Sequence, residues 1–476
     1  MVIIKTVIFM NKIVENIKKD FNKTPDLKIK EIKTNFFNSI FVLYIETICD
    51  SNKINDYILK NLTRYNRHTN LNSNIPGPNT IIIKEYNQIE HYITSGFTII
   101  INNKEIIAVE TRGEINRSIS SSTREPSLLG PEDAFIENYQ INMGLIKRRI
   151  KTKSYKSEEL FIGKRTKTIV SINYLEDVAN QTNIKLIREK LQKIDIDGII
   201  DVGTIMNYLE SENKTVFPTI KRTERPDLAS TAILEGKIVL LVDTSPFAII
   251  LPTFLVDFIN PISDNYVKSI NVIFIKLLRI IGFLLSMMLP GIFVAITNYN
   301  QETIPANLLI NFSMQQSGVP FPAIVELIIL LFICDILRES DLRFPSNFGS
   351  TISILGALII GEAAVNAGIV SPIMIIITSF TFISSLIFTE LEINNALRYY
   401  RYLFLFSGAL LGLYGIFLCS ILFLINITSI KSLNSPYFAP IAPFNKNYLF
   451  KGFLKNKDIN NNKRSSLIAS NDLTKG

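Results

Sequence analysis

Glu362 is the residue of this sequence whose chemistry most needs an explanation. It is the only charged residue in the otherwise apolar, polar or small-residue run from Phe344 to Thr389. An isolated carboxylate in such a run costs free energy, so it is either a costly accident or a functional group. Two interpretations stay open: Glu362 helps to conduct cations, or it packs against a buried donor or lies near a membrane interface.

The spacing around Glu362 predicts a helix with two different faces. At steps of four, three and four residues, one face would carry Leu355, Ile359, Glu362 and Asn366, our candidate pore or gate. In a ring of such helices the carboxylates would attract cations, while Leu355 and Ile359 would form a constriction that gates by dewetting. A second face would carry small residues that let helices pack closely, namely Ala357, Gly361, Ala364 and Gly368.

Pro290 and Gly291 interrupt an uncharged run from Ile280 to Gln301. Proline removes a helical hydrogen bond and kinks the segment. We consider the pair a candidate hinge, and a static kink at a packing site is the alternative.

Four further charged residues are candidate subunit contacts. Glu326 lies in an apolar stretch, and Arg338 can pair with Asp335 three residues earlier on a helix. Arg222 and Arg225 lie among carboxylates in a proline-flanked segment, where bidentate pairing could lock a linker against a neighbour. The alternatives are an interfacial helix with solvated charges and a solvated loop.

We expect no catalytic, cofactor or metal site and therefore no enzyme. The sequence holds no GxxxxGK[ST] loop, no GxSxG elbow and no HExxH motif. Its three cysteines and two histidines have no metal-ligand spacing, which argues against zinc and against a disulfide framework. The net charge of +8 comes from scattered basic residues and a basic tail, so we expect contact with membrane lipid rather than nucleic acid.

The elements that would position these residues divide the chain in two. We predict an α+β membrane protein, in which two small soluble α/β lobes precede a multi-span α-helical membrane domain. The predicted domains are lobe 1 at 1–115, lobe 2 at 116–243, the helical membrane domain at 244–430 and a basic C-terminal tail at 431–476.

The soluble half alternates strand-like and helix-like runs. A hairpin is predicted from Phe97–Ile101 and Glu105–Val109, which flank three polar residues. Strands are also predicted at Phe36–Glu46, Thr168–Leu175 and Ile238–Val242. Helices are predicted at Lys53–Arg64, Glu132–Ile150 and Glu176–Lys193.

The second half offers five long apolar segments, which predict four to six membrane crossings. The preceding run Thr244–Val256 is too short to cross and fits a re-entrant or interfacial segment. Arg398 and Arg401 precede the last apolar segment and the basic tail follows it, so they cannot all be cytoplasmic if that segment crosses once. The start of the chain lacks a cleavage site of the signal-peptide type, so we expect the soluble half to be cytoplasmic.

Several motifs, in order along residues 30–445, resemble the A subunit of the spore-germination nutrient receptors, the GerA family. They include GPEDAFIENYQINMGLIKRRI, KIDIDGIIDVG, FPTIKRTERPD and LEGKIVLLVDTSPFAIILP in the soluble half. The helical half contributes GVPFPAIVE, DILRESDLRFP, AGIVSPIMI and SPYFAPIAPF.

The resemblance implies a multi-pass subunit of a receptor complex in the spore inner membrane. Its implied partners are a transporter-like B subunit that senses the nutrient, a lipoprotein C subunit, and further copies of itself in a ring with a central ion path. Opening that path would release cations and start germination. The alternatives are a nonconducting signalling scaffold or accessory germination protein of the same family, and a secondary transporter that uses Glu362 to relay protons.

The sequence departs from the family pattern at two places. The family usually has Arg-Gly-Pro-Arg where this chain has Leu129-Gly130-Pro131-Glu132, which weakens an expectation that this turn binds an anion. The family usually has Gln at the position of Glu362, so the carboxylate is this chain's own variation.

Overall fold

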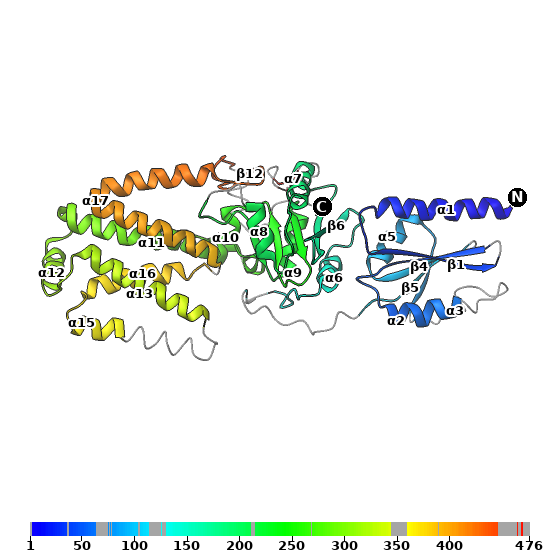
Figure 1. Ribbon diagram of the computed structural model, residues 1–476, viewed down its shortest axis with the longest axis horizontal. Coiled ribbons are helices and arrows are strands. Elements are labelled where there is room, and N and C mark those ends of the chain that lie inside the picture. Colours follow the sequence, from blue (N-terminus) through cyan, green and yellow to red (C-terminus); the bar gives the residue numbers. More distant parts are fainter. Residues whose placement is uncertain are drawn as a thin grey trace.

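The computed structural model describes residues 2–35, 38–62, 75, 77, 79–102, 105–113, 125, 130–210, 215–267, 269–343, 359–388, 390–445, 464, 468 and 469. The molecule is elongated (Figure 1), with the N-terminal lobe at one end, a second lobe in the middle and a helical region at the other end. The chain thus has two β-sheets in its N-terminal region and a helical C-terminal part, as the predicted fold class requires.

The first lobe is an antiparallel sheet in the order β1-β2-β4-β5-β3. Its strands are β1 Leu27–Asn35, β2 Asn38–Ile45, β3 Thr80–Ile83, β4 Phe97–Ile101 and β5 Ile106–Glu110. Its helices are α1 Val2–Asp20, α2 Ser51–Lys53, η1 Ile54–Leu59, α3 Lys60–Leu62 and α5 Tyr86–Thr94. The predicted hairpin is confirmed, because β4 pairs with β5 in antiparallel register.

The second lobe repeats the plan with the strand order β6-β7-β9-β10-β8. Its strands are β6 Tyr155–Ile162, β7 Thr168–Leu175, β8 Lys221–Thr223, β9 Ile238–Val242 and β10 Ala248–Leu251. Its helices are α6 Tyr139–Arg149, α7 Gln181–Gln192, α8 Val202–Glu210 and α9 Pro226–Leu234. The predictions for β7 and β9 are confirmed to the residue.

Two predictions near this lobe were wrong. The run Thr244–Val256 is no membrane segment, because it supplies β10, whose residues are all buried, and the start of α10 Leu255–Ile259. The helix predicted from Glu132 begins only at Tyr139, because the side chain of Asn138 accepts a hydrogen bond from the Ile141 N–H and caps it there. A strand that is buried on both faces is apolar at nearly every position. Its sequence therefore shows the same continuous apolar run as a membrane segment.

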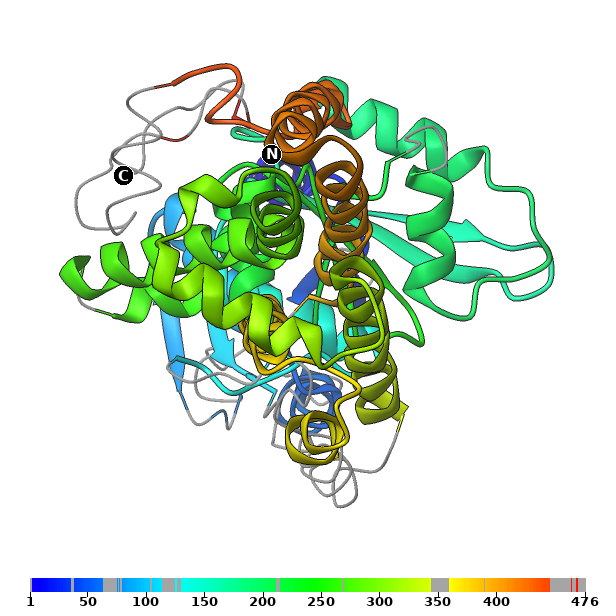
Figure 2. The ribbon, with the colours of Figure 1, turned by 90° about the vertical axis from the view of Figure 1, so that its left-hand side faces the viewer.

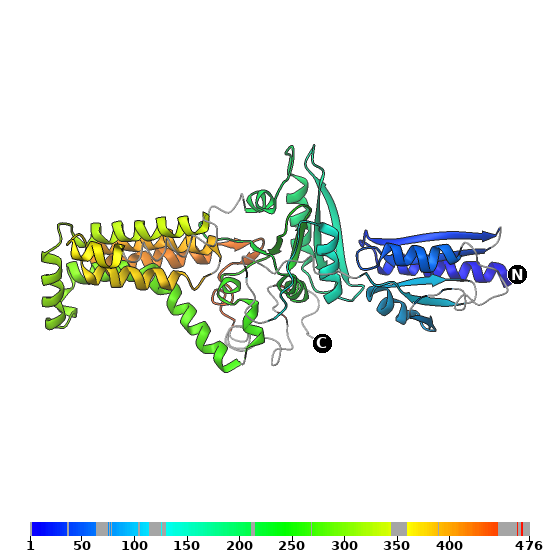
Figure 3. The same ribbon diagram turned by 90° about the horizontal axis from the view of Figure 1, so that it is seen from below.

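The helical region is a bundle of long helices that run along the molecule, with one short helix across its far end (Figure 3). After η2 Ile262–Tyr266 come α11 Ser269–Tyr299, η3 Gln301–Thr303, the transverse α12 Ala306–Ser317 and α13 Ala323–Arg343. They are followed by η4 Ile359–Ala363, α15 Ala364–Asn366, α16 Pro372–Ser385 and α17 Leu391–Ser429. Within the part of the chain that the structure describes, two segments, Asn271–Tyr299 and Leu391–Ser429, are long and apolar enough to cross a membrane.

Helix α17 doubles back on itself at Gly412. The rings of Tyr400 and Phe423 lie 4.9 Å apart between centroids, whereas a straight helix would separate the two residues by about 34 Å. Gly412 has φ 60° and ψ −145°, a conformation that only glycine adopts without strain. Tyr299 covers the turn and donates its hydroxyl to the carbonyls of Ala409 and Leu410. The two arms lie beside α11 when the bundle is viewed from its far end (Figure 2).

After α17 the chain returns to the second lobe through the hairpin of β11 Lys431–Ser432 and β12 Ser435–Pro436. The Ser432 hydroxyl donates to the Thr219 carbonyl at 2.6 Å and accepts from the Thr253 N–H at 2.9 Å. The predicted C-terminal tail is therefore partly folded, and its described residues Ile468 and Ala469 are also buried.

Candidate functional site in the helical region and at its junction with the second lobe

The segment that carries Glu362 lies at the far end of the helical region. Ile359–Ala363 forms a π-helical turn and Ala364–Asn366 one α-helical turn. Glu362 and Asn366 are exposed on this chain. Leu355 and Ala357 lie outside the described residues, so the predicted constriction stays a prediction. A π-helical turn is a common feature of functional sites in helices.

The predicted small-residue face is only partly formed. Ala364 packs against the cluster of α13 and α16 residues around Leu327 and Leu331. Among the described residues, a Cβ at Gly361 would meet no atom within 4 Å, so a neighbour could approach this glycine closely. Gly368 lies beyond the end of α15 in a turn with φ 67°, so it does not continue the helical face as we predicted.

Pro290 and Gly291 lie where α11 crosses the first arm of α17. Helix α11 continues through Pro290. A Cβ built on Gly291 would lie 2.7 Å from the carbonyl carbon of Phe404 and nearer still to its oxygen. A Cβ on Gly408 would lie 3.1 Å from the carbonyl carbon of Gly291 and nearer to that oxygen. The two backbones are thus in direct contact, which only glycine permits.

Glu326 has a partner within its own chain. It is fully buried in the first turn of α13, and its carboxylate accepts hydrogen bonds from the N–H and, at 2.8 Å, the hydroxyl of Ser371. Ser371 is the N-cap of α16, so Glu326 caps a second helix. The other carboxylate oxygen, Oε2, is buried and has no hydrogen-bond partner among the described residues. Glu326 thus lies in the interior, which corrects our assignment of this residue to a subunit contact.

Asp335 binds residues of α17 rather than the residue we predicted. Arg398 Nε lies 3.1 Å from its Oδ1, and the Tyr402 hydroxyl donates to Oδ2 at 3.0 Å. Arg338, the predicted partner, instead stacks over Phe382 of α16 at 5.5 Å from the ring centroid. Arg401 is almost fully buried and donates Nε to the Ser286 carbonyl at 2.8 Å. Sequence reasoning used Arg398 and Arg401 only for topology and missed this cluster.

The second lobe contacts the start of α17 through ion pairs and aromatic side chains. Arg222 lies 3.8 Å from Glu392, and Lys221 lies 3.8 Å from Glu390. Beside them, buried aromatic side chains from the lobe, both arms of α17 and the C-terminal hairpin form one cluster. Its members are Phe217, Tyr400, Phe423 and Tyr437. The predicted role of Arg222 in contacting another subunit stays a prediction, but the residue also joins the lobe to α17.

Arg225, the other arginine of this segment, is buried and forms a bidentate pair with Asp227 at 2.7 and 3.0 Å. The pair locks the start of α9, and Tyr266 donates its hydroxyl to the same carboxylate at 3.2 Å. Arg225 therefore stabilises its own lobe, which corrects its assignment to a subunit contact.

Glu125 adds a carboxyl group to the junction. Burial, reinforced by the nearby carboxylate of Glu390, raises the pKa of Glu125 to about 7. It accepts a hydrogen bond from the Thr223 hydroxyl at 2.6 Å. A group with this pKa changes charge near neutral pH, at the point where the lobe meets α17.

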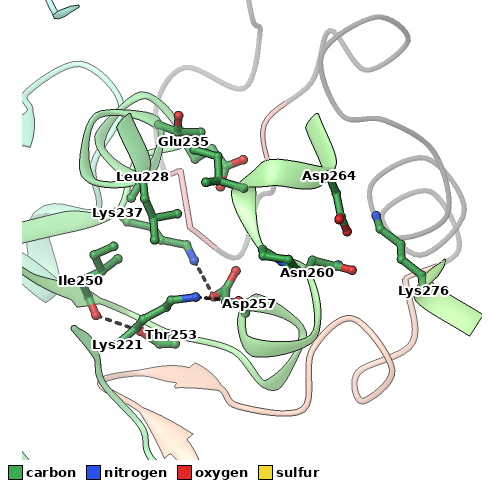
Figure 4. Close-up of a pocket in the computed structure, with 14 residues that line it drawn as sticks. Lys221, Leu228, Glu235, Lys237, Ile250, Thr253, Asp257, Asn260, Asp264 and Lys276 are labelled. Carbon is green, nitrogen blue, oxygen red and sulfur yellow. Dashed lines mark hydrogen bonds and ion pairs between the residues drawn. The ribbon is translucent and has the colours of Figure 1, made fainter. Parts of the chain in front are cut away.

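A cavity of about 60 Å³ lies between α9, the strands β8 and β10, α10 and α11 (Figure 4). Lys237 pairs with Asp257 at 2.5 Å, and Lys221 donates to the Asp257 carbonyl at 3.0 Å. The side-chain amide of Asn260 is buried with neither of its polar atoms hydrogen-bonded. A cavity of this size holds a few waters, which would satisfy that amide. Among the residues that the structure describes, no group of three His, Cys, Asp or Glu side chains could hold a metal ion.

Comparison with known protein families shows which family the chain belongs to. The sequence profile described as "Bacillus/Clostridium GerA spore germination protein" matches residues 15–467. The chain belongs to the GerA family. This match confirms the resemblance drawn from the motifs.

Individual GerA proteins are similar to this chain over most of their length. Spore germination protein KA of Bacillus subtilis (strain 168) is 34% identical over 438 residues, which cover 90% of this chain and 80% of that protein. Spore germination protein GerQA of Bacillus cereus is 32% identical over 437 residues, 91% of this chain and 87% of that protein. A solved structure, the N-terminal domain of the A subunit of the Bacillus megaterium spore germinant receptor GerK3, is 28% identical. It covers 52% of this chain and 95% of its own, with a TM-score of 0.39.

Proposed function

We propose that the chain is the A subunit of a spore nutrient germinant receptor. In this proposal it crosses the spore inner membrane several times, forms a homo-oligomer, and forms or gates a cation channel that triggers germination. A B subunit that senses the nutrient and a lipoprotein C subunit are its proposed partners. Membership of the GerA family supports the role in germination.

The path of the chain supports an even number of crossings. It leaves the second lobe before α11 and rejoins that lobe at β11, after the hairpin of α17. If the lobe lies on one side of the membrane, four or six crossings satisfy this path and five do not. The hairpin also brings Arg398, Arg401 and the basic tail to the same side, which we propose is the cytoplasm.

The exposed segment at Gly361 and Glu362 is the observation that carries the channel proposal. Among the described residues a Cβ on Gly361 would meet no atom within 4 Å, and Glu362 is exposed while Ala364 packs against the α13–α16 cluster. In an oligomer, Gly361 would admit a neighbouring helix and Glu362 would contribute to a ring of carboxylates.

The test is cation flux through wild-type and Glu362→Gln protein in lipid vesicles. Removing one carboxylate per subunit should weaken the preference for cations over anions while conduction persists, because the family usually carries an amide here. Glu302→Gln is the matched control, since Glu302 is also exposed at the far end, in η3. Unchanged flux and selectivity in Glu362→Gln would remove Glu362 from the pore.

A nonconducting scaffold is the second candidate, and the junction favours it. The pairs Arg222–Glu392 and Lys221–Glu390, with the aromatic cluster, tie the soluble lobe to α17 at several points. Such a junction suits a subunit that passes on a signal from a nutrient-binding partner. Purified oligomers that show no ionic current in any lipid would favour the scaffold over the channel.

A further inference from the structure

A buried polar contact fixes the C-terminal end of the segment that carries Glu362. Glu326 of α13 accepts hydrogen bonds from the N–H and, at 2.8 Å, from the hydroxyl of Ser371, the N-cap of α16. Both residues are fully buried. Ser371 follows Glu362 by only nine residues. We call the contact between Glu326 and Ser371 the α13–α16 latch.

A tight turn joins the latch to the segment formed by η4 and α15. The Ile369 N–H donates to the Ala364 carbonyl at 3.0 Å. The Gly368 N–H donates to the Val365 carbonyl at 2.9 Å. Together with the φ of 67° at Gly368, these two bonds make a Schellman turn, which closes the end of α15. Ser371 lies two residues beyond this turn, so a shift of Ser371 reaches α15 with little slack.

Burial changes abruptly at the latch. Glu362, Asn366 and Ile369, which precede it, are exposed. Val370 and Met374, on either side of the N-cap residue, are buried members of the cluster around α13 and α16. The latch is therefore a point at which an exposed segment is fastened to the packed interior of the bundle.

A carboxylate is a costly side chain at the position of Glu326. Its neighbours on α13, Leu327 and Leu330, belong to the same buried apolar cluster. Its Oε2 is buried and has no hydrogen-bond partner among the residues that the structure describes. Along α13 the nearest basic residue is Arg338, about 18 Å away. A buried polar atom without a partner costs free energy, and apolar side chains often replace buried charges without loss of stability. The carboxylate therefore contributes direction rather than stability.

We propose that Glu326 is a positioning residue for Glu362. By holding the N-cap of α16, it fixes the direction in which η4 and α15 leave the packed interior, and with it the place of the Glu362 carboxylate. Glu326 is fully buried, so it acts through this segment and not by lining a path for ions. The inference rests on the proposed channel function, in which Glu362 sets the preference for cations.

The first experiment measures amide hydrogen exchange at residues 364–371 of the full chain in lipid nanodiscs. Glu326→Ala should speed exchange there by about tenfold to a hundredfold, the factor that corresponds to a hydrogen bond to a charged group. Glu326→Gln keeps an oxygen acceptor of the same reach and should exchange at nearly the wild-type rate. Ser371→Ala removes the hydroxyl but keeps the N–H, so its rate should lie between those of the wild type and Glu326→Ala.

Leu327→Ala is the matched control for this measurement. It removes a fully buried side chain from the same cluster, next to Glu326, and leaves both partners of the latch in place. If Leu327→Ala speeds exchange at residues 364–371 as much as Glu326→Ala does, the effect is a general loosening of the bundle and the proposal fails. Exchange in Glu326→Gln as fast as in Glu326→Ala would contradict a hydrogen-bonded latch.

The second experiment measures the preference for cations over anions in lipid vesicles. Glu326→Ala should lower this preference toward that of Glu362→Gln. Adding Glu326→Ala to Glu362→Gln should lower it no further, because Glu326 acts through Glu362. Additive losses, or a wild-type preference in Glu326→Ala, would overturn the positioning role. A wild-type protein without any current would contradict the proposed channel instead, and the exchange rates would still decide whether Glu326 holds the segment.

Discussion

Replacing Gly291 by alanine tests the direct backbone contact between α11 and the first arm of α17. The new Cβ would lie 2.7 Å from the carbonyl carbon of Phe404, and the neighbouring atoms are backbone that cannot rotate away. Overpacking of this kind costs about 1–3 kcal/mol, and we place this change near the upper limit. The better helix propensity of alanine returns about 1 kcal/mol, so the net loss is about 2 kcal/mol.

The assay is thermal unfolding in detergent, followed by circular dichroism because the chain has no tryptophan. A loss of about 2 kcal/mol lowers the Tm by about 4–8 °C at the slope typical of larger domains. Gly203→Ala in α8 is the control, because among the described residues a Cβ there meets only Asp201 Oδ2, at an ordinary contact distance of 3.6 Å, and should not lower the Tm.

Gly408→Ala disturbs the same contact from the side of α17. The free energy of unfolding that the double variant loses should therefore be smaller than the sum of the losses in the two single variants. Equal Tm values for Gly291→Ala and Gly203→Ala would refute close packing at this crossing. A loss of cation flux in Gly291→Ala with an unchanged Tm would instead favour the hinge that the sequence predicts.

Three further predictions address the hairpin and the contact between the lobes. Spin labels at positions 400 and 423 should report a short distance, whereas a distance of about 34 Å would show α17 to be a straight helix. Gly412→Ala should weaken the hairpin by about 1–3 kcal/mol, because its φ of 60° is strained for alanine. Between the lobes, burial alone would raise the pKa of Asp26, but the Lys147 ammonium and hydrogen bonds from Lys147 and Thr47 outweigh it and hold that pKa below its usual value. A lowered pKa in the folded state stabilises the protein above the unfolded pKa, and the stabilisation is lost as the pH falls through the folded value. Asp26→Asn should therefore lower the free energy of unfolding at pH 7 by about 3–5 kcal/mol, and its stability should fall less between pH 5 and pH 3 than that of the wild type. Denaturant titration at both pH values measures this, and parallel pH profiles would contradict the role of the pair.

The sequence predicts the second lobe well wherever one local signal dominates. Strands β7 and β9 are β-branched or apolar runs bounded by polar turns, and their limits follow directly. Strand β10 has the same composition, but its place in a buried sheet position depends on pairing with β8 and β9. An apolar run carries no record of these pairings, so the run alone could not separate a buried strand from a membrane segment.

The helical region shows where local patterns stop being informative. The uncharged run after Arg401 contains Gly408, Gly412 and Gly415, and nothing in their types says which of them takes a positive φ. The spacing of Asp335 and Arg338 permits a helical pair, yet Arg398 and Tyr402 from α17 hold the carboxylate. Tertiary partners decided both cases. Family membership, by contrast, follows from ordered motifs and needs no structure.

The two ends of the helical region are fastened to each other. Where the chain leaves the second lobe, the Thr253 N–H donates to the Ser432 hydroxyl and the Leu255 N–H donates to the Tyr437 carbonyl at 3.0 Å. The whole bundle is therefore an insertion into the second lobe, clamped at its base. A rotation of that lobe must turn the first and the last helix together, so torque applied to the lobe reaches the bundle without stretching any linker.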